Sequence, residues 1–276
     1  MNKVTTLRDA LARAHALGLE RIDGQMLLLH LLGRAGHDRA WLLTHDTDAL
    51  PPALMASYEA LCQRRAHGEP VAYLTGTKEF YGLPLQIDAR VLDPRPDTET
   101  LVDWALEVIA PLPAPRILDL GTGSGAIALA LQHARPDAHV RAVDASPDAL
   151  AVARANAHRL QLGVVFQQGD WLDGLQGPFD LIVSNPPYIA EGDPHLAALH
   201  HEPAQALSSG ADGLDDLRTL IAQAPSRPAH GGWLLLEHGW DQAGAVHKLL
   251  ATADFQALQS RTDLSGTVRC SGGQKA

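Results

Sequence analysis

The sequence has few cysteines, no long apolar run and no excess of basic residues, and each of these absences excludes a class of protein. Cys62 and Cys270 are isolated, without a Cys-x-x-Cys pair, so neither a disulfide framework nor a cysteine-based metal site is expected. No apolar stretch approaches the roughly 20 residues that a transmembrane helix needs. The 22 Lys and Arg residues are outnumbered by 32 Asp and Glu, and the net charge of -10 argues against a large nonspecific nucleic-acid surface.

The amino-terminal segment also lacks the apolar core of a signal peptide, because charged residues such as Lys3, Arg8 and Arg13 interrupt it. The chain does contain 46% hydrophobic and 20% charged residues, which is typical of a soluble globular protein. We therefore expect a cytoplasmic protein. Its 276 residues are sufficient for one large domain or two smaller ones.

Residues 1–70 carry apolar side chains at helical spacing, which predicts a small all-α bundle. We find no catalytic combination of residues in this bundle and interpret it as a scaffold or docking domain. The expected helical segments, with Thr and Pro residues at their starts, cover approximately residues 5–18, 21–32, 40–43 and 51–65.

The next segment, residues 71–94, changes to the alternating pattern of β-strands and predicts a β-hairpin. This hairpin is expected to link the helical domain to a second domain over residues 95–276. Near the start of the second domain, Asp97 or Thr98 is expected to cap a helix.

From residue 116 onward, strand-like and helix-like segments alternate, which predicts a parallel β-sheet with helices on both faces, a Rossmann-like α/β fold. The pattern begins with a buried strand at residues 117–120, a glycine-rich turn at 121–125 and a helix at 126–134. The next strand, residues 139–143, ends on Asp144.

The glycine-rich turn and Asp144 indicate a nucleotide-type ligand. Glycines lack Cβ atoms and let the backbone pass close to a ligand, and Asp144 follows the turn by about 20 residues, where an acid accepts hydrogen bonds from a ribose. A dinucleotide and S-adenosylmethionine both stay open, since Ala126 can replace the third glycine of a dinucleotide turn. Asp119 favours S-adenosylmethionine, because its charge would repel a pyrophosphate. Asp170 beside Trp171 would suit an adenine.

Residues 185–188, Asn-Pro-Pro-Tyr, directly follow the strand-like segment 179–184. Neither proline can donate to a sheet ladder, so the chain must leave the sheet at the carboxyl end of a strand, where open α/β sheets bind ligands. The turn therefore holds an amide side chain, two backbone carbonyls and an aromatic ring in a stiff conformation.

These motifs resemble the class I methyltransferases that methylate planar amino or amide nitrogens. Over almost the whole chain, the sequence resembles the HemK-type release-factor glutamine methyltransferases, through further motifs at residues 79–83, 94–99, 202–207, 212–214 and 236–239. The resemblance implies a class I methyltransferase sheet, a hairpin linker and an N-terminal helical domain that recognises the substrate. It also implies transfer of a methyl group from S-adenosyl-L-methionine to the N5 amide of the glutamine in the Gly-Gly-Gln motif of class I peptide chain release factors, with S-adenosyl-L-homocysteine as product.

The resemblance also implies roles for individual residues. Catalysis and binding of the substrate glutamine fall to Asn185, Pro186 and Tyr188, and Pro187 joins them in binding. In these roles the side-chain oxygen of Asn185 and the carbonyl of Pro186 would accept both protons of the planar NH2 group, and Tyr188 would stack on it. A carboxamide nitrogen needs such orientation, because its lone pair is delocalised into the carbonyl. We expect a monomer that binds release factors and binds neither a membrane nor nucleic acid directly. The cofactor contacts implied by the resemblance are Gly121, Thr122, Gly123, Ser124, Gly125, Asp144, Trp171 and Asn185.

Three alternatives share parts of this pattern. A ribosomal-protein glutamine methyltransferase has the same catalytic requirements. A nucleic-acid amino-methyltransferase acting on adenine N6 or guanine N2 solves the same planar-nitrogen problem, although the acidic charge counts against it. A noncatalytic cofactor-binding module or a dinucleotide oxidoreductase would leave residues 185–188 unexplained.

Two further features follow the Asn-Pro-Pro-Tyr motif. Residues 191–209 are polar, and we expect a lid there. Its His195, His200 and His201 do not have the spacing of a common metal site, so exposed histidines and no metal are expected. The C-terminal Gly-Gly-Gln at residues 272–274 matches the tripeptide that the family modifies; coincidence explains it best, and self-methylation is a remote hypothesis.

Overall fold

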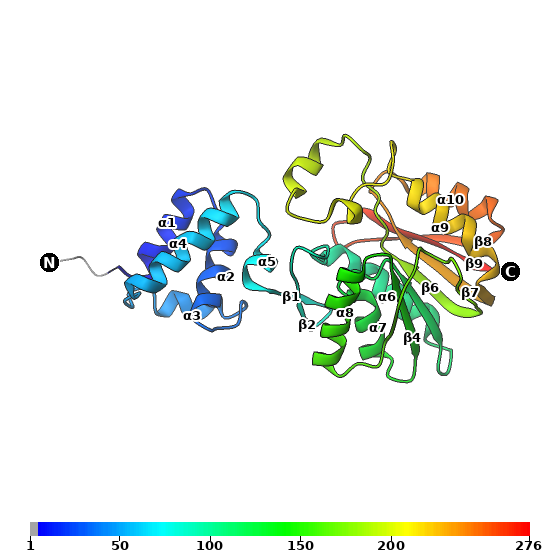
Figure 1. The fold of residues 1–276 in the computed structure, drawn as a ribbon, viewed down its shortest axis with the longest axis horizontal. Helices are drawn as coiled ribbons and strands as arrows, with labels where there is room; N and C mark the ends of the chain where they lie inside the picture. Colours follow the sequence, from blue (N-terminus) through cyan, green and yellow to red (C-terminus); the bar gives the residue numbers. More distant parts are fainter. Residues whose placement is uncertain (1–4) are drawn as a thin grey trace. The chain divides into compact units, whose positions relative to one another are not determined.

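The computed structural model describes residues 5–276 and contains two compact units, divided between Thr77 and Lys78 (Figure 1). The first unit is helical, and the second is an α/β unit built on a seven-stranded sheet. Among the described residues, the helices are all too short or too polar to span a membrane.

The first unit confirms the predicted helical bundle. Its first helix begins with a capping box, in which the Thr6 hydroxyl accepts from the Asp9 amide and the Asp9 carboxylate accepts from the Thr6 amide. In the core, Leu27 is fully buried and the Tyr58 hydroxyl donates to the Gly24 carbonyl at 3.0 Å. The helices of this unit are α1 (Leu7–Ala16), α2 (Arg21–Leu31), α3 (Arg39–Thr44), α4 (Pro52–Ala66) and α5 (Val71–Thr75).

The hairpin starts later than its sequence pattern predicts. Residues Val71–Thr75, which we assigned to the hairpin, form a single helical turn. Pro70 supplies the extended backbone before this turn, and Gly76 ends it with a left-handed φ of 70°. Pro70 and Gly76 thus set the two ends of this helical turn, and the apolar pattern of the residues between them does not predict it. The hairpin itself consists of β1 (Thr77–Phe80) and β2 (Leu83–Gln86).

The large sheet confirms the Rossmann-like α/β prediction. Its strand order is β5-β4-β3-β6-β7-β9-β8, with the first five strands parallel and β9 antiparallel to both of its neighbours. The chain order reverses between β3 and β6, which makes this point the switch at which open α/β sheets bind ligands. The strands are β3 (Arg116–Leu120), β4 (His139–Asp144), β5 (Val165–Gln168), β6 (Phe179–Ser184), β7 (Pro228–Glu237), β8 (Phe255–Thr262) and β9 (Val268–Lys275).

Helices cover both faces of the sheet. One face, which includes Leu118, Ile182 and Leu234, packs in a single apolar cluster with side chains of α9 and α10. Because side chains alternate along a strand, the neighbouring Ile117 and Val183 face the opposite side, where α6 and α7 contact the sheet. The helices are α6 (Glu99–Ile109), α7 (Ala126–Ala134), α8 (Pro147–Leu160), α9 (Asp215–Gln223) and α10 (Ala243–Thr252), with 3-10 turns η1 (Pro96–Thr98), η2 (Pro194–Leu199), η3 (Ala204–Ala206) and η4 (Ala224–Ser226).

The C-terminal Gly-Gly-Gln is part of the sheet and is not a free tail. Gly272 and Gly273 are buried in β9, between β7 and β8. The Gln274 amide donates to the Gly231 carbonyl at 2.8 Å. A methyl acceptor must reach the active site, and this tripeptide is held in a strand ladder, so the folded chain does not support the self-methylation hypothesis.

Candidate active site at the carboxyl edge of the sheet

The register of the parallel strands brings the predicted motifs to one edge of the sheet. Leu120, the last residue of β3, pairs with Val143 on one side and with Ser184 on the other. Ser184 in turn pairs with Leu236 of β7. The glycine-rich turn, Asp144, Asn185 and Glu237 therefore all follow directly from paired strand ends.

The glycine-rich turn is held close to the sheet by backbone hydrogen bonds. The amide of Gly121 donates to the Val143 carbonyl at 2.9 Å, and the amide of Gly123 donates to the Asp144 carboxylate at 2.8 Å. Both glycines have left-handed φ values, 67° and 54°. A Cβ on Gly121 would lie 3.3 Å from the Trp171 ring, so this position requires both the conformation and the small size of glycine.

Asp119 has a different role from the one that its sequence position indicates. Its side chain is fully buried, accepts from the Thr122 hydroxyl at 2.6 Å and from the Ala128 amide at 3.2 Å, and does not line the cavity described below. Burial raises the pKa of Asp119 to about 7. The residue fastens the turn to α7, and it does not line the cavity in which we expected its charge to act.

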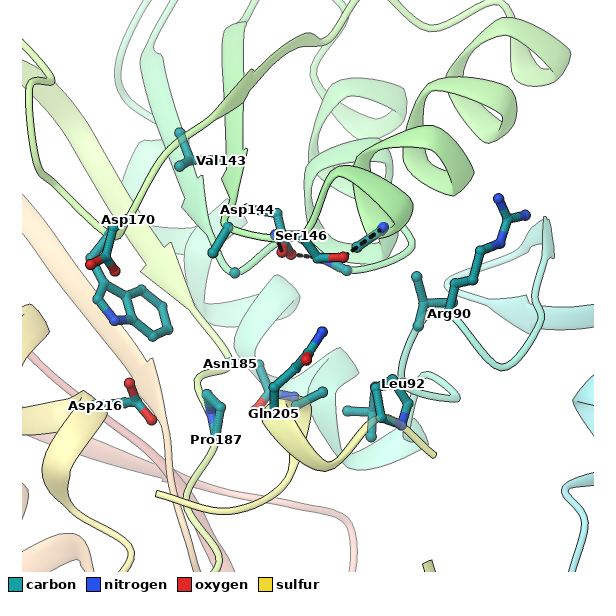
Figure 2. A pocket seen from close by; sticks show the side chains of 18 of the residues that line it. Arg90, Leu92, Val143, Asp144, Ser146, Asp170, Asn185, Pro187, Gln205 and Asp216 are labelled. Atoms are coloured by element: carbon teal, nitrogen blue, oxygen red, sulfur yellow. Dashed lines mark hydrogen bonds between the residues drawn. The ribbon is translucent and has the colours of Figure 1, made fainter. Parts of the chain in front are cut away.

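A cavity of about 250 Å³, the first cavity, lies between the strand ends and the segment after β6 (Figure 2). Five of the residues predicted to contact the cofactor line it: Gly121, Gly123, Asp144, Trp171 and Asn185. Sequence reasoning missed other lining residues, including Arg90, Leu92, Ser146, Gln205 and Asp216. In Figure 2, Asp144 and Ser146 lie on the side opposite Asn185 and Pro187, with Arg90 at one end and Asp170 and Asp216 toward the other.

The other three predicted cofactor contacts do not line the first cavity. The Thr122 side chain is buried against Asp119, and the Ser124 carbonyl accepts from the Asn156 amide at 3.0 Å. At Gly125, an added Cβ would lie 3.3 Å from Ala153, so this glycine allows α7 and α8 to pack closely. Thr122, Ser124 and Gly125 thus support the glycine-rich turn through contacts with the rest of the fold, away from the first cavity.

The backbone contributes to the positions of Asp144 and Trp171 in different ways. The two carboxylate oxygens of Asp144 accept from the amides of Ser146, at 2.9 Å, and Gly123. Burial raises the pKa of Asp144, and these two hydrogen bonds act in the opposite direction. Trp171 has a φ of 47°, which is uncommon for a bulky residue and marks a local conformation that the surrounding structure must maintain.

Asn185 adopts one defined orientation. Its Nδ2 donates to the Thr98 hydroxyl at 3.2 Å, whereas its Oδ1 accepts no hydrogen bond from any residue between 5 and 276. We expected Asp97 or Thr98 to cap α6. Thr98 does occupy the N-cap position, but no side-chain hydrogen bond caps the helix. The Thr98 hydroxyl is used by Asn185, a contact between residues 87 positions apart that local sequence patterns do not reveal.

Tyr188 is also held by distant residues. Its hydroxyl donates to the Glu237 carboxylate at 3.2 Å, and its backbone carbonyl accepts from the Gln242 amide at 3.0 Å. Burial raises the pKa of Tyr188, and burial raises the pKa of Glu237 to about 7. Glu237 belongs to the motif at residues 236–239, but sequence reasoning assigned it no role in the site; the contact with Tyr188 supplies one.

A second cavity, of about 410 Å³, lies on the other side of Asn185. Pro186 and Tyr188 line this cavity, and Asn185 lines both cavities. The remaining lining residues are mostly apolar and come from the linker and the segment after β6: Leu92, Arg95, Ile189, His195, Ala198, Leu199, Ala206 and Leu207. The two cavities share Asn185, Leu92 and Ala206 in their walls, and two adjoining cavities of this kind are suited to hold a group donor and a group acceptor.

The segment expected to be a lid contains η2 and η3 and borders both cavities. It is fastened by Glu202, whose buried carboxylate accepts from Arg95 at 2.5 Å and from the Asp93 amide at 3.1 Å. His195 lies within 2.7 Å of Asp193, and the rings of His200 and its neighbour pack together. Asp93, at the end of the linker, and Arg95, at the start of the second domain, thus hold this segment in place.

Comparison with known proteins places these features in a family. Residues 5–76 match the family described as PrmC N-terminal domain, and residues 99–212 match the family described as Methyltransferase small domain. A protein from Bordetella pertussis named release factor glutamine methyltransferase is 49% identical over 274 residues, which cover 98% of this chain and 99% of that one. A protein of the same name from Escherichia coli is 42% identical over 272 residues and 97% of each chain.

A solved methyltransferase from Pyrococcus furiosus has the same fold, with a TM-score of 0.54 and 17% identity over 80% of this chain and 99% of that one. At such low identity this likeness concerns the fold alone. The relatives with 42 and 49% identity, by contrast, extend over both units. The chain belongs to the family of release factor glutamine methyltransferases.

Proposed function

We propose that this chain transfers a methyl group from S-adenosyl-L-methionine to the side-chain amide nitrogen of the glutamine in the Gly-Gly-Gln motif of class I peptide chain release factors. The observation that carries the proposal is the position of Asn185 between two cavities, with its Nδ2 engaged and its Oδ1 available. Family membership supports the identity of the substrate. The reaction belongs to translation termination, and we propose that the protein works in the cytoplasm.

The first cavity fits S-adenosyl-L-methionine. Gly121 and Gly123 supply backbone without Cβ atoms along its wall, the Asp144 carboxylate suits a ribose diol, and the Trp171 ring offers a face for adenine. Asp170, beside Trp171, offers an acceptor for an adenine amino group. When bound, the cofactor supplies an activated methyl group on a sulfonium.

The protein's own contribution is to prepare a weak nucleophile. The lone pair of a carboxamide nitrogen is delocalised, so the amide has to be held by both of its protons with the nitrogen facing the methyl group. Asn185 Oδ1 and the Pro186 carbonyl are the two proposed acceptors, and both residues line the second cavity. Tyr188 covers the amide plane and excludes water.

This arrangement needs orientation more than acid–base catalysis. The cofactor would supply the methyl group, and the methylated amide nitrogen would be acidic enough to release one of its two protons to solvent, so no strong base has to act before attack. Correct positioning of reacting groups contributes several kcal/mol, up to about 7–11 kcal/mol in ideal cases.

We also propose that the helical unit recognises the release factor and that the enzyme acts as a monomer without binding nucleic acid directly.

The test offers radiolabelled S-adenosyl-L-methionine to the full-length chain together with a release factor, ribosomal protein or DNA in parallel reactions. We expect label on the release factor, at the glutamine of Gly-Gly-Gln, and not on a variant factor with Gln replaced by Ala. Label on ribosomal protein alone would indicate the related glutamine methyltransferase activity. Label on DNA alone would contradict the proposal.

A further inference from the structure

The orientation of the Asn185 carboxamide decides whether the site presents an acceptor or a donor to the substrate amide. A carboxamide rotated by half a turn would exchange its oxygen and its NH2 group, and an NH2 group cannot accept the protons of a substrate amide. Asn185 makes a single side-chain hydrogen bond among the described residues, from Nδ2 to the Thr98 hydroxyl at 3.2 Å. Thr98 is therefore in a position to determine which end faces the substrate.

Thr98 itself needs a partner that fixes the direction of its hydroxyl. A hydroxyl has one proton to donate and lone pairs to accept with. If the proton points at another acceptor, the lone pairs are left for Asn185 Nδ2. Thr98 is buried, and its hydroxyl lies near enough to the Glu237 carboxylate to lower the pKa of that acid. A carboxylate without a proton only accepts, so it turns the Thr98 proton away from Asn185.

Glu237 holds the other side of the clamp as well. Its Oε1 accepts from the Tyr188 hydroxyl at 3.2 Å, which fixes the ring that would cover the substrate amide. It stands at the end of β7, and its preceding residue Leu236 pairs with Ser184, the residue before Asn185. One carboxylate thus interacts with hydroxyls that control two parts of the Asn-Pro-Pro-Tyr clamp.

The contacts of Glu237 do not indicate that this residue stabilises the fold. The side chain is 1% exposed, and its Oε2 has no hydrogen-bond partner within the described part of the chain. Arg269 faces it, although this arginine pairs with Asp97 at 3.0 Å and with Asp263 at 2.9 Å. A buried carboxylate oxygen without a hydrogen bond lowers stability. A role in positioning accounts for an acid at this place.

We propose that Thr98 and Glu237 are positioning residues, which together orient the Asn185 carboxamide and the Tyr188 ring for methyl transfer. Glu237 directs the Thr98 proton, Thr98 binds Asn185 Nδ2, and Asn185 Oδ1 is left to accept a substrate proton. The proposal rests on the proposed function, because it assigns these residues to the same amide clamp. It adds two residues, from η1 and β7, that lie outside the Asn-Pro-Pro-Tyr motif.

The kinetic test uses Thr98→Val, Thr98→Ser and Glu237→Gln in the full-length chain. Valine keeps the shape of threonine without the hydroxyl, whereas serine keeps the hydroxyl. We expect Thr98→Val to lower kcat by about 10- to 100-fold, with the cofactor Kd and the KM for the release factor nearly unchanged, and Thr98→Ser to restore most of the activity. Glu237→Gln should lower kcat in the same way while its melting temperature stays the same or rises.

The matched control is Ser271→Ala. Ser271 is fully buried in the same sheet, where its hydroxyl bonds to His238 at 2.8 Å and to Ser260 at 2.8 Å, and it lines neither cavity. Loss of this hydroxyl should lower the melting temperature and leave kcat unchanged. Equal kcat for Thr98→Val and the wild type, or equal losses in Thr98→Val, Thr98→Ser and Ser271→Ala, would overturn the positioning role.

A second measurement needs no substrate. In ¹⁵N-labelled protein, the Asn185 side-chain NH2 signal, assigned by its loss in Asn185→Ala, should exchange with solvent more slowly in the wild type than in Thr98→Val. Equal exchange rates would contradict the proposal even if the acceptor protein were misassigned. If the wild type methylates ribosomal protein and not release factor, the proposed function fails, and the same kcat comparison with that acceptor still decides the positioning role.

Discussion

At the scale of single residues, the site depends on polar side chains that make hydrogen bonds to the protein and still have acceptor capacity for a ligand. Asp144 accepts two backbone hydrogen bonds behind the first cavity, and Asn185 donates to Thr98 and keeps Oδ1 available. Side chains held in this way lose little freedom when a ligand binds. Pre-organisation of this kind favours the reaction because less ordering remains to be done in the transition state.

Replacement of Asn185 by alanine removes one of the two acceptors for the substrate amide. We expect kcat to fall by about 100- to 1000-fold, comparable to the loss of one group that stabilises a transition state. The cofactor Kd should change much less, because Asp144, Trp171 and the glycine-rich turn still line the first cavity. Kinetics with release factor and calorimetric titration with cofactor measure the two quantities. A loss of cofactor affinity as large as the loss of kcat would contradict the assigned role.

The ionisation of Glu237 predicts a pH dependence of catalysis. Burial raises its pKa from 4.5 to about 7, while the hydroxyls of Thr98 and Tyr188 and the charge of Arg269 act in the opposite direction and Asp97 raises it further. Below pH 7 the protonated carboxyl can donate, and the direction of the Thr98 hydroxyl is no longer enforced. We therefore expect kcat to rise between pH 6 and pH 8 through a midpoint of about 7.

The control for this profile is Glu237→Gln, which should have a lower and flatter kcat across the same pH range.

The pH dependence of folding stability has the opposite sign to that of activity. Because the pKa is raised on folding, the folded state holds this proton more tightly between 4.5 and about 7, so ionisation of Glu237 lowers stability as pH rises through that window. The buried thiol of Cys270, which also faces Glu237, has a raised pKa and stays neutral in this range. A wild-type kcat that does not change with pH would count against the model of hydroxyl direction.

At the scale of elements, sequence patterns predicted what is local and missed what is tertiary. The helix Ala126–Ala134 and the end of a strand at Asp144 were predictable, because glycine spacing and apolar periodicity specify them within a few residues. The helical turn Val71–Thr75 was mistaken for a strand, since five residues do not establish a period. The use of Thr98 depends on a partner 87 positions away, and no local pattern contains that information.

The turn at Gly213 supports the catalytic motif from a different element. Gly213 has a φ of 75°, and an added Cβ would lie 2.2 Å from the Tyr188 carbonyl oxygen. The Gln242 amide bridges the two, at 3.0 Å to the Tyr188 carbonyl and 3.3 Å to the Gly213 carbonyl. The close approach of these segments requires glycine, and any larger residue must push the backbone of Tyr188.

Gly213→Ala is therefore expected to lower both the melting temperature and kcat. The matched variant is Gly266→Ala, whose position has a similar φ of 84° with open space where the Cβ would be. Both changes carry the backbone strain of a left-handed alanine, about 1–2 kcal/mol, but only the first displaces Tyr188. Thermal unfolding and steady-state kinetics of the two variants separate strain from displacement. Equal kcat values in both variants would show that the Tyr188 backbone does not depend on this turn.

At the scale of the whole molecule, the two units have separate cores and separate contributions to the site. The apolar cluster around Leu27 and Tyr58 draws all its buried members from the helical unit, and the cluster around Leu118 and Ile182 draws all of its members from the second unit. Every residue that lines the two cavities described above also belongs to the second unit. The walls of both cavities are thus built by the second unit alone.

Removal of the helical unit should separate recognition from chemistry. A chain of residues 78–276 keeps every residue that lines the first cavity. We therefore expect it to bind S-adenosyl-L-methionine with a Kd within about threefold of the full chain, a difference smaller than the tenfold that corresponds to 1.4 kcal/mol. Its kcat/KM for the full-length release factor should fall by at least about tenfold if the helical unit supplies 1.4 kcal/mol of binding energy. For a short Gly-Gly-Gln peptide, which cannot reach a second binding surface, the two chains should have equal kcat/KM. Calorimetry and labelled-methyl transfer measure these quantities, with circular dichroism to establish that the shorter chain is folded. Equal activity of both chains on the full-length factor would refute a recognition role, because binding energy from a distant surface is then not used.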